Sequence, residues 1–366
     1  MLRGRVRRCV LASCLLSCAP ACEPRPAPSD EIAFMRRGRV MIVDANGSAE
    51  RALTETLRHE TERPVTWTPD GSRVLYWNHS DIGWDIWSVP VDGGDAVNLT
   101  RVASGGCRSP APSPDGSLIA FVRDDPEGVH LMNADGSNQR RVTERAHRDQ
   151  APSWSADGSR LVFLVLHDDR REIERLDLSR GATTTLVRGS SPSFSPDGRR
   201  VLFVARRDGA ACLCTISSDG SGEHRLTSDP GGAHDPAWSP DGRRIAYFTE
   251  LQGTTALRVL SLDGGENTAI ASFEGRALAP PSWAPDGRRL AVGIETERGA
   301  EILVVDDQGR SRREIAANGA RYPAWRPAAT RAAPNRATAA PAPSPAPSPS
   351  AAPSAPDPNA APSARP

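Results

Sequence analysis

The sequence predicts an all-β fold, a seven-bladed β-propeller whose four-stranded blades close into a ring. One motif, which reads PAWSPDGRRIAY at residues 236–247, recurs with small changes along most of the chain. Its aspartate recurs in steps of 45, 42, 40, 44 and 45 residues, at Asp70, Asp115, Asp157, Asp197, Asp241 and Asp286. A period of about 40–45 residues is typical of propeller blades.

Each copy of the motif predicts a β-hairpin. A short apolar run leads into Ser-Pro-Asp-Gly, as at 239–242, and a second apolar run follows. Proline presets φ at the second turn position, aspartate suits the third, and glycine tolerates a positive φ. Asn46-Gly47 and Asp135-Gly136 mark a further hairpin after the first, because such dipeptides favour tight turns. Two hairpins supply the four strands of one blade.

These residues resemble the repeats of a known family. Ser-Pro-Asp-Gly, followed by Asp-Gly-Ser and by Asn-Leu-Thr at 98–100 or Arg-Leu-Thr at 225–227, is similar to the TolB-like (PD40 or WD40-like) propeller repeat. The resemblance covers residues 31–327 and implies the fold, whereas one fold hosts many activities. Full-length TolB proteins carry an α/β domain before the propeller. Only a short segment separates Cys18 from the first repeat strand, so we do not expect a complete TolB.

The repeats also predict that the two ends of the propeller share a blade. Ile32-Ala-Phe34 looks like a second strand without a first, whereas the motif around Trp325 looks like a first strand without a second. We therefore expect the C-terminal strand to complete the N-terminal blade. Closure removes the exposed sheet edges that an open array would leave.

Residues 1–17 predict a lipoprotein-type signal peptide. Four arginines precede a run of apolar and small residues that is too short to span a membrane. Leu-Leu-Ser-Cys at 15–18 resembles the bacterial lipobox and so predicts lipidation of Cys18. Cys14 and Cys22 are alternatives, and an ordinary cleaved signal peptide is a further one. The signal peptide with a lipidated cysteine predicts a periplasmic or surface-exposed lipoprotein of the cell envelope, and we expect it on the outer rather than the inner membrane.

Composition divides the rest of the chain into three parts. Residues 18–30 are Pro-rich and predict a tether, and residues 31–327 carry the propeller repeats. Residues 328–366 are rich in Ala, Pro and Ser and contain no aromatic residue. Such a segment cannot bury enough apolar surface to fold, so we expect a disordered tail.

Charge and cysteine content exclude some partners. Lys plus Arg and Asp plus Glu are balanced at 45 each, and removing the four signal arginines leaves 41 against 45. Without a basic face we expect no nucleic-acid partner.

Cys212 and Cys214 are two apart on a predicted strand, so both thiols face one side. We expect two small buried thiols, and an exported chain also permits a bridge from Cys107 to one of them.

No motif of catalysis is present. The sequence contains no Gly-x-Ser-x-Gly nucleophile elbow, phosphate-binding loop or His-Glu-x-x-His metal helix. We therefore expect no catalytic residue, no cofactor and no metal ligand. An aromatic residue recurs at one position in six of the seven copies, for example Trp154 and Trp283, and Pro112 replaces it in the remaining copy. We interpret this series as packing between blades rather than as a ligand platform.

The candidate binding residues precede the first strand of each blade. We expect the loops there to open at one face near the central channel, where polar groups from several blades can form a site. The candidates are His59, Arg63, Arg108, His147, Asp149, Gln150, His234, Asp235, Arg321 and Tyr322. Solvated loop residues are the simpler interpretation.

Two functions remain open. The first is a non-enzymatic, envelope-anchored scaffold, a monomer that binds a protein or a cell-envelope polymer. The alternative is a metal-dependent polysaccharide lyase of the oligogalacturonate type, or a glycan-binding propeller, because oligogalacturonate lyases have a similar fold with a histidine-lined metal site.

Overall fold

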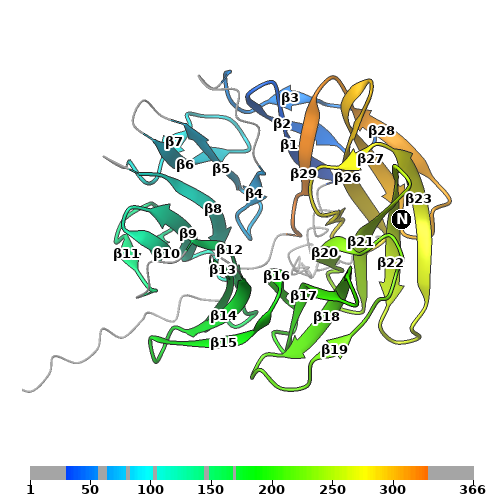
Figure 1. Cartoon of the computed structure of the whole chain (residues 1–366). Coiled ribbons are helices and arrows are strands. Elements are labelled where there is room, and N and C mark those ends of the chain that lie inside the picture. The colour runs from blue at the N-terminus through cyan, green and yellow to red at the C-terminus, as the bar shows by residue number, and fades with distance from the viewer. Residues whose placement is uncertain are drawn as a thin grey trace, which may run out of the picture. The chain divides into compact units, whose positions relative to one another are not determined.

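The structure is a computed structural model that describes residues 30–56, 64–79, 83–101, 105–143, 148–167 and 170–328, with only the backbone at 148–150. The described residues form seven antiparallel sheets, each with four strands in the blade pattern, arranged in a ring (Figure 1). Every regular element in this part of the chain is a β-strand. The prediction of an all-β, seven-bladed propeller is confirmed.

We number the blades from the N-terminus and give their strands from the centre of the ring outwards. Blade 1 contains β29 (Ala320–Trp325), β1 (Glu31–Arg36), β2 (Arg39–Asp44) and β3 (Arg51–Ala52). Blade 2 contains β4 (Thr66–Trp67), β5 (Arg73–His79), β6 (Trp84–Pro90) and β7 (Val97–Asn98). Blade 3 contains β8 (Cys107–Pro112), β9 (Leu118–Asp124), β10 (Glu127–Asn133) and β11 (Arg140–Arg141). Blade 4 contains β12 (Arg148–Trp154), β13 (Arg160–Leu166), β14 (Arg171–Asp177) and β15 (Ala182–Arg188).

The remaining blades follow the same order. Blade 5 contains β16 (Ser190–Phe194), β17 (Arg200–Arg207), β18 (Ala210–Ser217) and β19 (His224–Arg225). Blade 6 contains β20 (His234–Trp238), β21 (Arg244–Leu251), β22 (Thr254–Ser261) and β23 (Asn267–Glu274). In blade 7 the inner strand is split into β24 (Arg276–Ala277) and β25 (Ser282–Trp283), before β26 (Arg289–Thr296), β27 (Gly299–Asp306) and β28 (Arg312–Ala316).

The ring closes as the repeats predict. Strand β29 pairs antiparallel with β1, with Trp325 opposite Ile32, so the C-terminal strand completes the N-terminal blade. The guanidinium of Arg289 adds two hydrogen bonds to the Asp30 carboxylate, at 3.0 and 2.7 Å. Closure therefore combines a strand pairing with an ion pair across the junction of blades 7 and 1.

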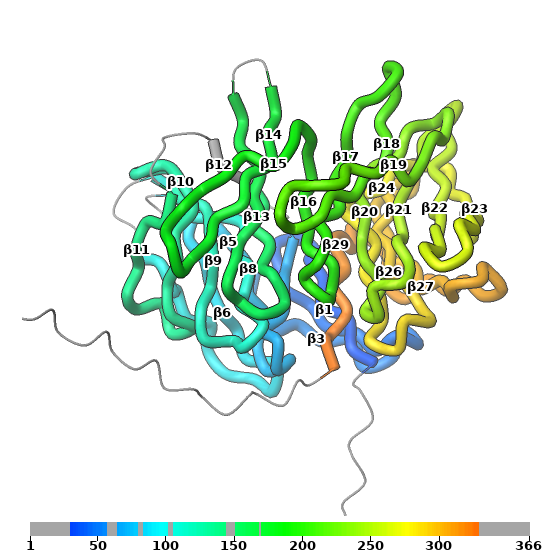
Figure 2. The backbone as a smooth tube through the Cα atoms, turned by 90° about the horizontal axis from the view of Figure 1, so that it is seen from below, coloured from blue at the N-terminus to red at the C-terminus, as the bar shows by residue number. Residues whose placement is uncertain are grey.

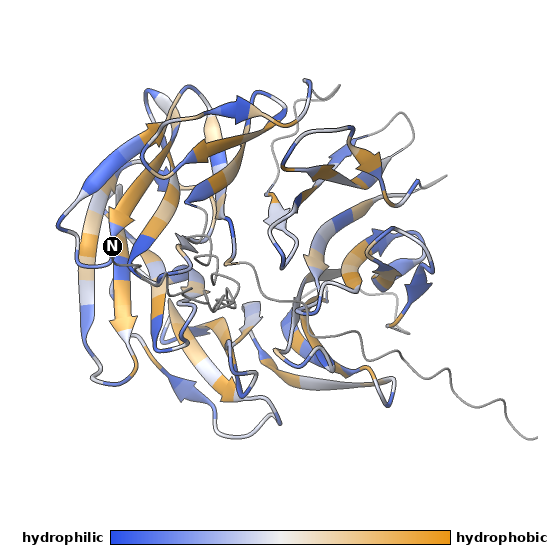
Figure 3. Ribbon diagram, turned by 180° about the vertical axis from the view of Figure 1, so that it is seen from behind, coloured by the Kyte–Doolittle hydropathy of each residue, from blue (hydrophilic) through white to orange (hydrophobic). Residues whose placement is uncertain are grey.

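Four of the recurring tryptophans donate a hydrogen bond to the blade before their own, whereas the indole nitrogen of Trp325 is buried without one. The indole N–H of Trp67 donates to the Ala324 carbonyl at 2.8 Å, and that of Trp154 donates to the Ala111 carbonyl at 2.8 Å. The same bond joins Trp283 to Ala237 at 3.1 Å. These bonds and the apolar clusters that span neighbouring blades confirm the packing interpretation. Figure 3 shows hydrophobic residues along the strands of every blade. A ring that is buried and hydrogen-bonded in this way offers no ligand platform.

The repeated Ser-Pro-Asp-Gly turn is closed by its own side chains. The Ser155 hydroxyl donates to Asp157 at 2.6 Å and accepts the Arg160 N–H at 2.9 Å, while the Ser159 N–H donates to the same carboxylate. The Ser155 hydrogen bond, above all, lowers the pKa of Asp157 to about 2. The conspicuous aspartates of the motif are therefore turn-forming residues.

The threonine of the Asn-Leu-Thr and Arg-Leu-Thr motifs has an equally local role. Thr100 and Thr227 accept a hydrogen bond on the hydroxyl from the backbone N–H of Ile86 and Leu213, each at 3.0 Å. The outer strands β7 and β19 are only two residues long. The threonine extends their bonding to the third strand of the blade.

Candidate functional site

The two ends of the ring are built from different parts of the repeat. We call the end where the inner strands begin the mouth end, and the end that carries the Ser-Pro-Asp-Gly turns the turn end. The hairpins that join the second and third strands also lie at the mouth end, and Figure 2 shows those of blades 4, 5 and 6 projecting together. Any site built from inner-strand starts must therefore lie beside these hairpins.

The predicted site residues that the structure describes lie at the mouth end, but they lie in strands and not in the expected loops. Seven belong to the inner strands themselves: Arg108 in β8, Asp149 and Gln150 in β12, His234 and Asp235 in β20, and Arg321 and Tyr322 in β29. His59, Arg63 and His147 lie outside the described residues, as does Cys18, and only the backbone of Asp149 and Gln150 is described. The strands extend further because their first residues still pair with the second strand of the blade.

A β-bulge recurs in five inner strands at the mouth end. Each bulge places a non-glycine residue at a φ of 49–57° directly before a proline. These residues are Ser109, Ala151, Ser191, Asp235 and Tyr322. The residue before proline is normally extended, and a non-glycine residue at positive φ costs about 1–3 kcal/mol. Bulges of this kind re-aim side chains at the rims of barrels and sites, so the mouth end carries repeated backbone strain.

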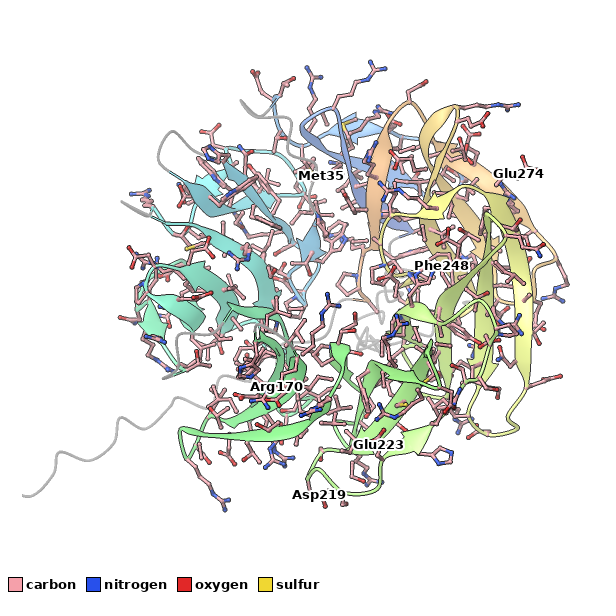
Figure 4. All side chains as sticks on the ribbon, in the orientation of Figure 1. Met35, Arg170, Asp219, Glu223, Phe248 and Glu274 are labelled. Carbon is pink, nitrogen blue, oxygen red and sulfur yellow. The ribbon has the colours of Figure 1, made fainter. Side chains whose placement is uncertain are left out.

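His234 and Asp235 form a coupled pair at one bulge. The Nδ1 of His234 lies 3.0 Å from the Asp235 carboxylate, and the imidazole stacks on Phe248 with ring centres 6.0 Å apart. Phe248 lies within blade 6 in Figure 4. A carboxylate at Nδ1 favours a proton on that nitrogen and leaves Nε2 as an acceptor. Nε2 is buried and makes no hydrogen bond, so the pair leaves one acceptor unsatisfied.

Arg321 belongs to an ion-pair cluster between blades 7 and 1. Its Nη2 donates to Glu295 at 2.7 Å, and Arg276 donates to the other oxygen of the same carboxylate at 2.7 Å. The hydrogen bond from Arg276 is the main cause of the lowered pKa of Glu295, and the charge of Arg321 adds to it. Tyr322 packs against the core between blades 1 and 2. Both candidates therefore also support the ring.

The neighbourhood of Arg108 contains aromatic residues that sequence reasoning missed. Arg108 pairs with Asp124 on the adjacent strand. Trp84 contacts Trp77 and His79 edge-on, with ring centres 5.2 Å apart in both pairs. A Cβ on Gly106 would lie 3.2 Å from Trp84 and 2.8 Å from Oδ2 of Asp124, so this glycine lets the two residues approach.

We call Trp77, His79, Trp84, Arg108 and Asp124 the aromatic patch. A signal for it exists in the sequence. Five of the eight tryptophans occupy the recurring inner-strand position: Trp67, Trp154, Trp238, Trp283 and Trp325. The other three, Trp77, Trp84 and Trp87, all fall within blade 2. Tryptophans outside the repeat position in a single blade indicate a role that the other blades do not share.

The described residues show neither a cluster of metal ligands nor a reactive thiol. Nowhere in that part of the chain do three or more His, Cys, Asp or Glu side chains gather as metal ligands. Cys107, Cys212 and Cys214 are buried and free, and the latter two sulfur atoms lie 3.8 Å apart. Burial raises the pKa of Cys107 and of Cys214 to about 12, so neither supplies a thiolate nucleophile at neutral pH. The expectation of buried thiols at Cys212 and Cys214 is confirmed, and the bridge that an exported chain would permit at Cys107 is absent. Across the described ranges no helix is long and apolar enough to cross a membrane.

Comparison with known proteins identifies the repeats. The model of the TolB β-propeller domain matches residues 66–240 and 234–333, which is more than half of the chain. The Tol-Pal system protein TolB of Anaeromyxobacter dehalogenans is 30% identical over 135 residues, 34% of this chain and 29% of that protein. The chain spans at most 56% of the length of the curated relatives it matches.

Solved structures share the fold at lower identity. TolB from Acinetobacter baumannii superimposes with a TM-score of 0.53 at 18% identity, over 81% of each chain. An oligogalacturonate lyase in complex with manganese superimposes with a TM-score of 0.62 at 17% identity, over 79% of this chain and 86% of the lyase. At these identities the similarity demonstrates the propeller fold alone.

Proposed function

The chain belongs to the TolB β-propeller family, and on that premise we propose that it is a non-enzymatic binding scaffold of the cell envelope. Its partner is a protein or an envelope polymer, captured at the mouth end of the ring. The relatives named for the Tol-Pal system support a protein partner. The fold supplies a rigid platform, and the site on it decides the function.

The observation that carries the proposal is the distribution of residues that do not follow the repeat. At the turn end the serines and aspartates satisfy one another within their own turns, as Ser155 and Asp157 do. At the mouth end Trp84 and Arg108 are partly exposed, and no other blade has a tryptophan where Trp84 begins the third strand. Tryptophan and arginine are the residue types most enriched at binding hot spots. The aromatic patch and the His234–Asp235 pair are therefore the proposed contacts.

The proposal includes an anchor and domain limits. Residues 1–17 act as the signal peptide, Cys18 carries the lipid, residues 18–30 form the tether and residues 328–366 trail as a tail. The acyl chains hold the monomeric protein to the outer membrane through their apolar contact with the bilayer. Cys18→Ala releases the protein from the membrane fraction. Incorporation of labelled fatty acid into that variant would move the anchor to Cys14 or Cys22.

A glycan is the second candidate partner, because the fold matches that of an oligogalacturonate lyase. One imidazole beside one carboxylate, His234 with Asp235, is too small a ligand set for a metal centre, so we derive no metal-dependent step. Metal analysis of the purified protein and an absorbance assay on uronate polymers separate the two candidates. If the protein contained bound metal and released unsaturated product from uronate polymers, the proposed scaffold function would be wrong and a lyase function would take its place.

The decisive experiment compares the two ends of the ring. A mouth variant carries Trp84→Ala, His234→Ala and Asp235→Ala, and a turn variant carries Asp135→Ala and Asp219→Ala. Asp219 lies at the outer rim in Figure 4, in a turn of blade 5. In pull-downs from envelope extract, the mouth variant loses the partner and the turn variant keeps it. Capture by the mouth variant but not by the turn variant would place the binding face at the opposite end.

A further inference from the structure

Two cysteines of blade 5 bring their sulfur atoms together in the core. Cys212 and Cys214 lie in β18, and residues two apart on a strand point to the same side of the sheet. Both side chains are buried in the apolar cluster between blades 4 and 5, and their sulfur atoms lie 3.8 Å apart. Both thiols are free. The pair therefore offers two sulfur donors, on one strand, to a third atom.

The cysteine pair does not follow from the propeller repeat. Leu213 and Ile86 occupy the same place in blades 5 and 2, since the N–H of each donates to the threonine hydroxyl of the motif at 3.0 Å. In blade 2 the residues on either side of that place are Asp85 and Trp87, whereas in blade 5 they are the two cysteines. A side-chain pair that a single blade carries indicates a role that the other blades do not share.

The distance between the two sulfur atoms suits a shared metal ion. A bond between a metal and a thiolate is about 2.3 Å long, so two thiolates on one ion lie at most about 4.6 Å apart. The observed 3.8 Å falls within this limit. One ion can therefore contact both sulfur atoms after small side-chain movements, and it needs no cavity because it takes the place of the two thiol protons.

The number and kind of the ligands select the ion. Structural zinc takes four ligands and hard cations take oxygen ligands. Among the residues that the structure describes, no group of three or more His, Cys, Asp or Glu could hold a metal. Soft thiolates favour Cu(I), and two thiolates are a sufficient ligand set for that ion. The pair therefore fits Cu(I) and does not fit zinc.

Positive charges lie beside the pair. Arg225 lies opposite Cys214 in the pairing of β18 with β19, so the two share a face of the sheet. Burial, above all, raises the pKa of the Cys214 thiol to about 12, and the charge of Arg207 opposes that rise. Each arginine also has an acidic partner, but Asp208, the partner of Arg225, is 85% exposed and its charge is screened by water.

These charges favour the occupied form of the site. When Cu(I) binds, two S–H bonds break, two S–Cu bonds form and both protons leave to solvent, with no change of oxidation state. The product carries one net negative charge, whereas the empty pair of thiols is neutral. The guanidinium groups of Arg207 and Arg225 stabilise the negative product.

We propose that Cys212 and Cys214 form a buried two-thiolate site for Cu(I) in blade 5. This inference does not rest on partner capture at the mouth end, and it involves neither the aromatic patch nor the His234–Asp235 pair.

The test measures Cu(I) binding to the full chain in competition with the chelator bicinchoninate, without oxygen and with the thiols reduced. The N-terminal cysteines are changed to Ser so that they bind no copper: Cys9, Cys14, Cys18 and Cys22. We expect one Cu(I) per chain and the ultraviolet absorption of Cu(I)–thiolate bonds. Since two protons leave for each ion, the affinity should rise about hundredfold per pH unit, against about tenfold for a single thiol.

Cys212→Ala leaves one thiolate and should weaken binding by about hundredfold or more, because loss of an outer-shell partner alone costs about 10–100-fold. The matched control is Cys107→Ala, which removes a single buried thiol from blade 3 and should leave binding unchanged. Circular dichroism melts show which variants fold. If Cys212→Ala fails to fold, Cys214→Ala replaces it, and the pH dependence of the parent chain tests the proposal without any substitution in the core.

Three outcomes would overturn the proposal. The first is the absence of stoichiometric Cu(I) binding by the parent chain. The second is equal affinity in the parent chain and in the folded Cys212→Ala or Cys214→Ala variant, or a tenfold pH slope. The third is a loss of binding in Cys107→Ala equal to that in Cys212→Ala, which would show that copper binds to buried thiols in general.

Discussion

The turn end and the mouth end of the ring use the same repeat in opposite ways. At the turn end, Ser155, Asp157 and their counterparts close each turn with hydrogen bonds inside the motif. At the mouth end, five inner strands carry a strained bulge, and the residues around it differ from blade to blade. Side chains that hydrogen-bond to one another stabilise the fold and leave few free groups to contact a partner. The end whose residues differ between blades is therefore the one that can recognise a specific partner.

Both ends of the ring depend on its closure, so a truncation that prevents closure should have the largest effect on stability. Deleting residues 320–366 removes β29, which pairs with β1, and should abolish cooperative folding because blade 1 loses its inner strand. Deleting residues 331–366 should leave the melting temperature unchanged. Circular dichroism melts of both truncations check this. Equal melting temperatures would mean that β29 is dispensable.

Tryptophans at the two ends should differ in their effect on stability. Trp154 is 9% exposed and donates to the carbonyl of Ala111, so Trp154→Ala should destabilise the protein by about 3–5 kcal/mol. Trp84 is partly exposed at the mouth end, and Trp84→Ala should cost about 1–2 kcal/mol. Urea unfolding of both variants measures the free energies. If Trp84→Ala lowered the free energy of unfolding more than Trp154→Ala, the assignment of Trp154 to packing and of Trp84 to binding would be wrong.

The turn end should respond to acid through its aspartates. The pKa of Asp157 is lowered to about 2, so its carboxylate contributes stability above the unfolded pKa of about 4. That contribution is lost as the pH falls through 2. Because the group is largely exposed, Asp157→Asn should cost no more than about 1 kcal/mol at pH 7. Melts at pH 7, 4 and 2 should show the wild-type advantage shrinking below pH 4.

The strain at the mouth end predicts the smallest effect. Ser191 has a φ of 52° before Pro192, and its backbone can relax if the side chain is removed. Ser191→Gly should raise the free energy of unfolding by between zero and about 1 kcal/mol. The relief of backbone strain slightly exceeds the entropy cost of glycine. Ser153→Gly, beyond the bulge in blade 4, should destabilise instead, because no strain is relieved there, the entropy cost of glycine remains, and the hydrogen bond from the Phe194 N–H to the Ser153 hydroxyl is lost. Thermal melts of both variants measure the difference, and a stabilised Ser153→Gly would remove strain as the explanation.

The sequence alone determined the architecture of this protein. Period, turn residues and the offset between Ile32 and Trp325 specify seven blades and their closure, because each of these signals is local and repeated. The sequence also determined that Trp154 and its counterparts pack between blades. A residue that recurs at the same position of the repeat is expected to support the contact that every blade makes with its neighbour.

Only the tertiary structure decided what surrounds the residues that break the repeat. The pairing of His234 with Asp235 arises from a bulge that no propensity predicts, since the residue before Pro236 is normally extended. The approach of Trp84 to Asp124 across Gly106 depends on how neighbouring strands and blades pack. Such contacts join residues distant in sequence, and their geometry exists only once the ring has closed.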